Sequence, residues 1–107
     1  MTHTVTEAQN GSTVAMAVGD VLEIHLPENP TSGYRWALDE IDEARVAAES
    51  PAYRGEDDRL GSGGMATWTL RAKTPGTTRV TLKHWRHWEG DRSVVQRFAV
   101  TLHIKPA

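Results

Sequence analysis

The stretch VLEIHLPENPTSGYRWAL (residues 21–38) contains two alternating segments separated by a loop rich in turn-forming residues. Before the loop, apolar residues occupy positions 22, 24 and 26, and after it they occupy positions 34, 36 and 38. Successive side chains of a strand point to opposite faces of the sheet, so alternation with a period of two is typical of a half-buried strand. The stretch therefore predicts two strands joined by a loop.

The same period recurs along the rest of the chain. We expect further strands over residues 14–18, 67–72, 80–83 and 98–104, and an edge strand over residues 2–7, which are rich in Thr and Val. Turn-forming pairs such as Asn-Gly at 10–11 and Pro-Gly at 75–76 separate these segments. Several short strands between such turns indicate an all-β sandwich or barrel.

Residues 39–60 do not follow this pattern. The segment EARVAAE (43–49) carries helix-forming residues, whereas YRGEDDRL (53–60) is acidic and resembles a loop. The sequence leaves open a helical turn, an irregular edge strand or a mobile excursion.

Composition narrows the class of protein. At 107 residues the chain has the size of one domain, spanning residues 1–107, and no apolar run is long enough for a membrane span or a signal peptide. A net charge of −2 with scattered Lys and Arg argues against nucleic-acid or acidic-membrane partners. Without cysteine there can be no disulfide, thiolate metal site or cysteine nucleophile. We expect a cytoplasmic protein if this is the whole chain, and a periplasmic or secreted one if a leader has been removed.

Three loops carry residue types that a simple connection between strands does not require. In residues 29–33, proline restricts φ, glycine permits a positive φ, and Asn, Thr and Ser can bond their own backbone, which predicts a rigid loop. In LGSGGM (60–65), three glycines allow another chain to approach closely. The segment HWRHWEGD (84–91) puts Trp85, Arg86 and Trp88 at the end of a strand, and an exposed Trp next to an Arg is the composition of a binding hot spot. In an up-and-down sandwich the three loops can share one end and form a composite binding edge.

These loops also carry a family resemblance. NPTSGY (29–34), GSGG (61–64) and RHWE (86–89) resemble, in order and spacing, the loops of the chagasin-like inhibitors of cysteine peptidases. Those inhibitors have an Asn-Pro-Thr-Thr-Gly-Tyr/Phe loop, a Gly-x-Gly-Gly loop and an Arg-Pro-Trp loop. The resemblance implies an immunoglobulin-like β-sandwich of about seven to eight strands. It also implies that the first loop enters the cleft of a papain-like peptidase near its catalytic Cys–His pair, while the other two grip the cleft on either side.

The resemblance assigns candidate peptidase-binding residues position by position: Asn29, Pro30, Thr31, Ser32 and Gly33; Gly61, Gly63 and Gly64; Arg86, His87 and Trp88. Two of them depart from the family pattern. Ser32 replaces the second threonine, which keeps the hydroxyl but loses a methyl group. His87 replaces the proline, which predicts a less restricted third loop.

The tryptophans are expected to divide between core and surface. Trp36 and Trp68 share the parity of core residues, so we expect both to be buried. Trp85 and Trp88 have opposite parity, so at least one should be exposed. On the resemblance we place Trp88 in the binding edge, and Trp85 stays open.

The positions of the histidines argue against a metal site. His84 and His87 would point to opposite faces of a strand, and His25 and His103 have the parity of surface residues.

The leading hypothesis is a reversible, tight-binding inhibitor of papain-like cysteine peptidases, acting as a monomer and using no cofactor. One alternative is a carbohydrate-binding or adhesion immunoglobulin-like module that uses exposed tryptophans, and another is a structural module of a larger assembly. Nothing in the sequence places a serine nucleophile on the strand–turn–helix elbow of a hydrolase, so we do not expect an enzyme.

Overall fold

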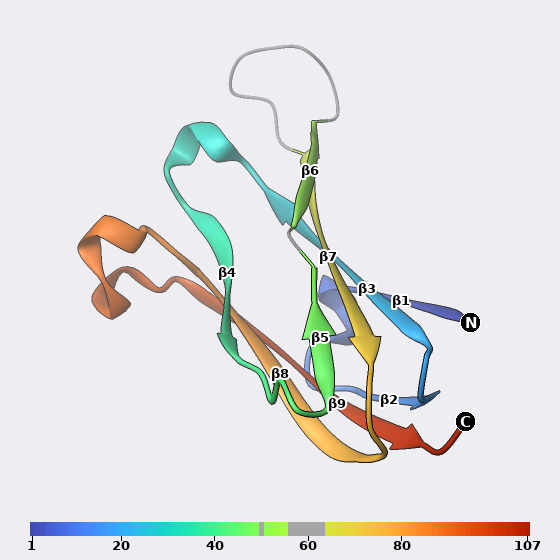
Figure 1. Ribbon diagram of the computed structural model, residues 1–107. Coiled ribbons are helices and arrows are strands. Elements are labelled where there is room, and N and C mark those ends of the chain that lie inside the picture. The colour runs from blue at the N-terminus through green and yellow to red at the C-terminus, as the bar shows by residue number, and fades with distance from the viewer. Residues whose placement is uncertain (50, 56–63) are drawn as a thin grey trace.

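A computed structural model describes residues 1–49, 51–55 and 64–107, which form two packed β-sheets (Figure 1). The strands are β1 (Thr2–Thr6), β2 (Thr13–Ala17), β3 (Val21–Glu28), β4 (Arg35–Glu40), β5 (Val46–Ala48), β6 (Ala52–Gly55), β7 (Gly64–Ala72), β8 (Gly76–Trp85) and β9 (Gln96–Lys105). Four short 3-10 helices lie in the connections: η1 (Glu7–Gln9), η2 (Pro30–Ser32), η3 (His87–Glu89) and η4 (Asp91–Ser93). None of these described helices is long and apolar enough to cross a membrane.

One sheet has the order β1-β3-β7-β5, with β6 also paired to β7, and the other has the order β2-β9-β8-β4. β1 runs parallel to β3 and β2 parallel to β9, and all other pairs are antiparallel. The predicted all-β sandwich is therefore confirmed, including the edge position of the first strand.

The core lies between the sheets, because the apolar positions of each strand face inward. In β3 the alternation is complete: Leu22, Ile24 and Leu26 are fully buried. They pack with apolar side chains of the other strands, among them Leu70, Val80, Leu82, Phe98, Val100 and Leu102. Each of these large side chains contributes roughly 1.5–3 kcal/mol when removed from water.

Residues 39–60 contain strands where a helical turn was one expectation. The helix-forming segment 43–49 makes only a turn at Glu43–Arg45, and then β5 pairs with β7. Val46 explains the outcome, since its fully buried side chain belongs to the core and pairing with β7 places it there. Tertiary packing thus overrides local helix propensity. With β5 and β6, the described residues hold nine strands instead of the seven to eight expected. Of the predicted loop 53–60, residues 53–55 belong to β6 and the remainder lies outside the described residues.

Asp20 organises the end of the sandwich where β2 turns into β3. Its carboxylate bonds the His3 ring at 2.9 Å, which ties β1 to the turn, and accepts the Ala17 N–H at 3.0 Å. The hydrogen bond from His3, followed by that from the Ala17 backbone, lowers the pKa of Asp20 from 3.8 to about 2. The charged form of this carboxylate is therefore favoured by folding.

Candidate functional site

Strand register brings the first and third candidate loops, and Gly64 of the second, to one end of the sandwich (Figure 1). β3 ends at Glu28, which pairs with Gly64 at the start of β7, and Gly64 also pairs with Gly55 at the end of β6. In the other sheet, Arg35 at the start of β4 pairs with Trp85 at the end of β8. Residues 29–34 connect the two sheets at this end, so the connection 86–95 lies beside them. The predicted common end is therefore present for the first and third loops.

The second loop is only partly described. Gly61 and Gly63 lie outside the described residues, whereas Gly64 is a buried strand residue that begins β7. Its backbone lies in register with the ends of β3 and β6, at the same end of the sandwich as the other two loops.

Internal hydrogen bonds hold the first loop in one conformation. The Asn29 side-chain oxygen accepts the Thr31 N–H at 3.1 Å and the Thr31 hydroxyl at 2.7 Å. The Ser32 hydroxyl donates to the Asn29 carbonyl at 2.7 Å and accepts the Tyr34 N–H at 3.2 Å. Gly33 has a φ of +82°, which favours glycine. The hydroxyl that Ser32 shares with the family's threonine is thus used inside the loop, and the loop is built as the sequence predicts.

The third loop is held by Ser93, a residue that the sequence did not single out. This buried serine accepts the Arg86 N–H at 3.0 Å, and its hydroxyl lies 2.9 Å from the Arg86 carbonyl and 2.7 Å from the Gly90 carbonyl. Arg86 is extended, with φ −102° and ψ 108°, and η3 begins at His87. The turn therefore starts at the position where the family has proline.

Arg86 ties the first and third loops together. Its guanidinium stands 4.3 Å from the centre of the Tyr34 ring, a distance typical of cation–π contact. One terminal nitrogen donates to the Glu89 carboxylate at 3.1 Å, and the other donates to the Ser32 carbonyl at 3.4 Å. The loops consequently form one surface.

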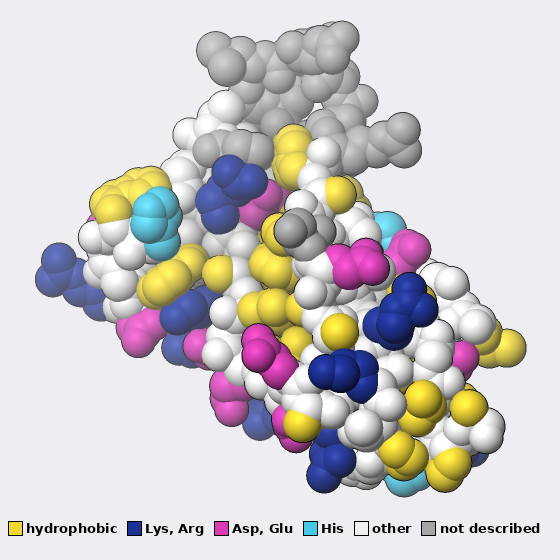
Figure 2. All heavy atoms as spheres, viewed as in Figure 1, with side chains coloured by type: hydrophobic (Ala, Val, Ile, Leu, Met, Phe, Trp, Pro, Cys, Tyr) yellow, Lys and Arg dark blue, Asp and Glu magenta, His cyan; other side chains and the backbone are white. Residues whose placement is uncertain are grey.

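Trp88 rests on the first loop and remains open to solvent. It is 63% exposed, yet its ring edge approaches Gly33 so closely that a Cβ on this glycine would lie 3.1 Å from Cη2. The surface at this end of the molecule presents hydrophobic, basic and histidine side chains next to one another (Figure 2). The predicted exposure of Trp88 is confirmed. A supported aromatic side chain with one free face is suited to contact another protein.

The other aromatic residues divide as expected. Trp36 and Trp68 are buried, at 5% and 8% exposure. Trp85, which the sequence left open, is half-buried, and the Lys83 ammonium lies 3.6 Å from the centre of its ring.

The histidines lie in three environments. His84 stacks on Trp36 at 4.7 Å between ring centres, and His103 is exposed as predicted. His25 is half-buried and bonds Glu23 and Thr67. Among the described residues no group of three His, Cys, Asp or Glu could hold a metal ion.

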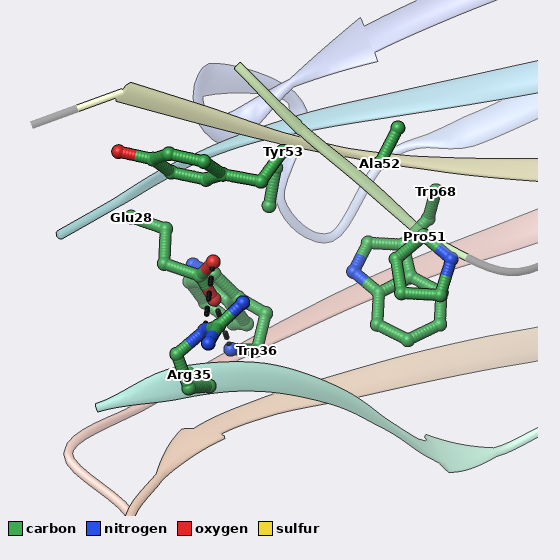
Figure 3. A pocket seen from close by; sticks show the side chains of 8 residues that line it. Glu28, Arg35, Trp36, Pro51, Ala52, Tyr53 and Trp68 are labelled. Carbon is green, nitrogen blue, oxygen red and sulfur yellow. Dashed lines mark hydrogen bonds and ion pairs between the residues drawn. The ribbon is translucent and has the colours of Figure 1, made fainter. Parts of the chain in front are cut away.

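A buried carboxylate lies directly behind the first loop. Glu28 is 5% exposed, accepts the Trp36 N–H at 2.7 Å and pairs with the Arg35 Nε at 3.1 Å (Figure 3). It lines a cavity of about 50 Å³ together with Tyr53 and Trp68, which is too small for a drug-sized ligand. The sequence held a signal for Glu28, since position 28 continues the inward series 22, 24 and 26.

Comparisons with known proteins identify the family. The profile of the chagasin family peptidase inhibitors I42 matches residues 15–102. Chagasin of Trypanosoma cruzi is 36% identical over 107 residues, covering 95% of this chain and 97% of chagasin. Amoebiasin-1 of Entamoeba histolytica is 30% identical over 84 residues, covering 78% of this chain and 82% of that protein.

The fold agrees with these sequence matches. The crystal structure of a cysteine protease inhibitor from Entamoeba histolytica superposes with a TM-score of 0.88 at 22% identity, covering 97% of this chain and 96% of that one. The architecture, the paired loops and the sequence relatives agree, and the chain belongs to the chagasin family of peptidase inhibitors.

Proposed function

We propose that this family member is a reversible inhibitor of papain-like cysteine peptidases and that its loop end fills the active-site cleft. The observation that carries the proposal is the joint surface of the first and third loops, in which Arg86 and Trp88 of one loop contact Ser32 and Gly33 of the other. The proposed contact residues are Asn29, Pro30, Thr31, Ser32, Gly33, Gly61, Gly63, Gly64, Arg86, His87 and Trp88.

The internal bonding of the first loop explains how a short segment can bind tightly. Ordering a free loop on docking costs roughly 0.5–1.5 kcal/mol for each immobilised side chain. Asn29, Thr31 and Ser32 already bond one another before any partner arrives. Most of the interaction energy of the loop is therefore available for binding.

The same stiffness supports inhibition without cleavage. The backbone of residues 30–32 is curled in η2 and closed by a hydrogen bond from the Ser32 N–H to the Asn29 carbonyl at 3.1 Å. A bond held in this turn cannot extend into an attackable geometry without breaking those contacts. The chain has no cysteine with which to form a mixed disulfide, so the complex is reversible.

Besides being a proposed contact residue, Arg86 has a role within the inhibitor. Its contacts with Tyr34, Ser32 and Glu89 use the charged head to hold the two loops at a fixed separation. Trp88 and the tip at Thr31 then meet the peptidase together, as parts of one rigid surface.

The carbohydrate-binding alternative is not supported. A flat sugar platform needs exposed aromatic rings side by side, but Trp36 and Trp68 are buried and Trp85 is covered by Lys83. Trp88 alone is widely exposed among the four tryptophans, all of which lie in described segments.

Progress curves with papain and with a cathepsin L-type peptidase test the proposal. We expect reversible inhibition with one-to-one stoichiometry, and an intact inhibitor on mass spectrometry after prolonged incubation. The absence of inhibition at micromolar concentrations, or steady cleavage between Thr31 and Gly33, would refute it.

A further inference from the structure

The base of the first loop lacks the support of an ordinary hairpin. In a hairpin the two strands that flank the loop pair with each other, and the ladder sets their separation. Here β3 belongs to one sheet and β4 to the other, and no strand pairing joins them in the part of the chain that the structure describes. Something else must hold the two ends of residues 29–34 at a fixed distance.

Side chains close this gap on both sides. Glu28, the last residue before the loop, accepts the Trp36 N–H at 2.7 Å and pairs with Arg35 at 3.1 Å (Figure 3). In the reverse direction, the Trp36 indole N–H donates to the Pro27 carbonyl at 2.9 Å. The two residues that enter the loop are thus tied to the two that leave it.

The hydrogen bond from the Trp36 N–H to Glu28 also satisfies a backbone donor on an open strand edge. Among the described strands, β4 is the outer strand of its sheet and has β8 as its one neighbour. The Trp36 N–H that bonds Glu28 therefore faces away from the ladder, where it would otherwise lack a strand partner. Oxygen Oε1 of Glu28 takes the place of that missing strand.

Overall stability does not account for a charge at this place. Burying a carboxylate costs several kcal/mol, and its partner Arg35 is 54% exposed, so the ion pair recovers little. An apolar side chain would suit the inward position 28 at least as well, since positions 22, 24 and 26 of β3 are apolar and fully buried. What an apolar side chain lacks is a directional acceptor for the β4 backbone.

We infer that Glu28 is a positioning residue of the inhibitor, whose carboxylate presets the separation of the two ends of the first loop and so prepares the loop for docking. The inference rests on the proposed inhibition of a papain-like peptidase. Glu28 touches no partner in this scheme and acts through the backbone of Trp36.

Three substitutions separate its roles. Glu28→Ala removes both contacts, and we expect the inhibition constant for papain to rise at least about tenfold, equivalent to about 1.4 kcal/mol. Glu28→Gln keeps an oxygen for the Trp36 N–H, and we expect it to stay within about threefold of the parent protein. Arg35→Gln removes only the exposed ion pair and should behave like Glu28→Gln.

Glu23 offers a matched control. It lies on the same strand, half-exposed and bonded to His25, away from the loop. Glu23→Ala should leave the inhibition constant unchanged.

Amide hydrogen exchange of the free proteins measures directly how well the first loop is ordered. We expect Glu28→Ala to speed exchange at Trp36, Tyr34 and Thr31 and to leave the core amides of β9 protected. If Glu28→Ala does not fold, Glu28→Asp keeps the charge but shortens the reach by one methylene, and it should still weaken inhibition and loosen the Trp36 amide.

The two proposals fail in different ways. Parent-like inhibition and parent-like loop exchange in Glu28→Ala, or in Glu28→Asp if the alanine variant does not fold, would overturn the role of Glu28. Equal weakening by Glu28→Ala and Glu28→Gln would also overturn it, because the retained acceptor would then have no value. If the parent protein does not inhibit papain, the proposed function fails, and hydrogen exchange still decides whether Glu28 orders the loop.

Discussion

Replacing His87 with proline should stabilise the protein and tighten its inhibition. Arg86 already has a ψ of 108°, within the extended region that a following proline imposes. His87 is the first residue of η3. Residues of 3-10 helices have φ between about −50° and −70°, a range that includes the value of about −65° that proline requires. Within residues 1–49, 51–55 and 64–107, no acceptor bonds the His87 N–H, so proline removes no backbone hydrogen bond.

The size of the effect follows from the contacts of His87. A compatible proline raises the free energy of unfolding by about 0.4–1 kcal/mol, because it restricts the unfolded chain. Against this stands the edge contact between the His87 and Trp88 rings, 5.2 Å between centres. Both side chains are exposed, so this pair contributes well under the roughly 0.5–1.5 kcal/mol of a buried aromatic pair. The net gain should be about 0.5 kcal/mol, which raises the melting temperature by about 2–4 °C.

Binding should improve on the same scale. If docking restricts residue 87 as proline does, 0.4–1 kcal/mol corresponds to a two- to fivefold lower inhibition constant, by the rule of about 1.4 kcal/mol per tenfold.

Thermal unfolding and inhibition constants of both proteins, measured in the same buffer, provide the test. A lower melting temperature would refute the assigned backbone compatibility. Weaker inhibition by His87→Pro would instead show that the imidazole makes a specific contact with the peptidase. Identical inhibition constants would place position 87 outside the interface.

The remaining predictions probe other parts of the molecule. Trp88→Ala should weaken inhibition by about 2 kcal/mol or more with little change in melting temperature. Trp68→Ala should instead lower the free energy of unfolding by about 3–5 kcal/mol. The reverse result would place Trp88 in the core. Gly33→Ala should destabilise the fold by about 1–3 kcal/mol because its φ is +82°, and it should also weaken inhibition because the new Cβ would displace the Trp88 ring. Gly19→Ala, with a φ of +92° and no atom within 4 Å of the new Cβ, should destabilise the fold without changing inhibition. The lowered pKa of Asp20 stabilises the folded protein above about pH 4, and this contribution is lost as the pH falls toward 2. In Asp20→Asn, the stability measured by circular dichroism should therefore depend less on pH over this acid range.

Residues 39–60 show that local helix propensity does not determine which element forms. The helix-forming residues at 43–49 form a turn followed by β5. The reason is that the Val46 side chain is buried by packing against the other strands and not against its own segment. Propensity differences of tenths of a kcal/mol per residue are small beside the burial of one large apolar side chain.

The sequence by itself determined the strands that alternate, the burial of Trp36 and Trp68, and the internal bonding of the first loop. These features depend on residues within a few positions of one another, whose side-chain directions follow from the period of the backbone.

Only the tertiary structure decided how the first loop is supported. The contact of Arg86 with Tyr34 and Ser32 joins residues more than fifty positions apart, and the bond from Trp36 to Glu28 exists because β3 and β4 enter different sheets. No local pattern encodes such a crossing, since it results from how the two sheets pack around their common core.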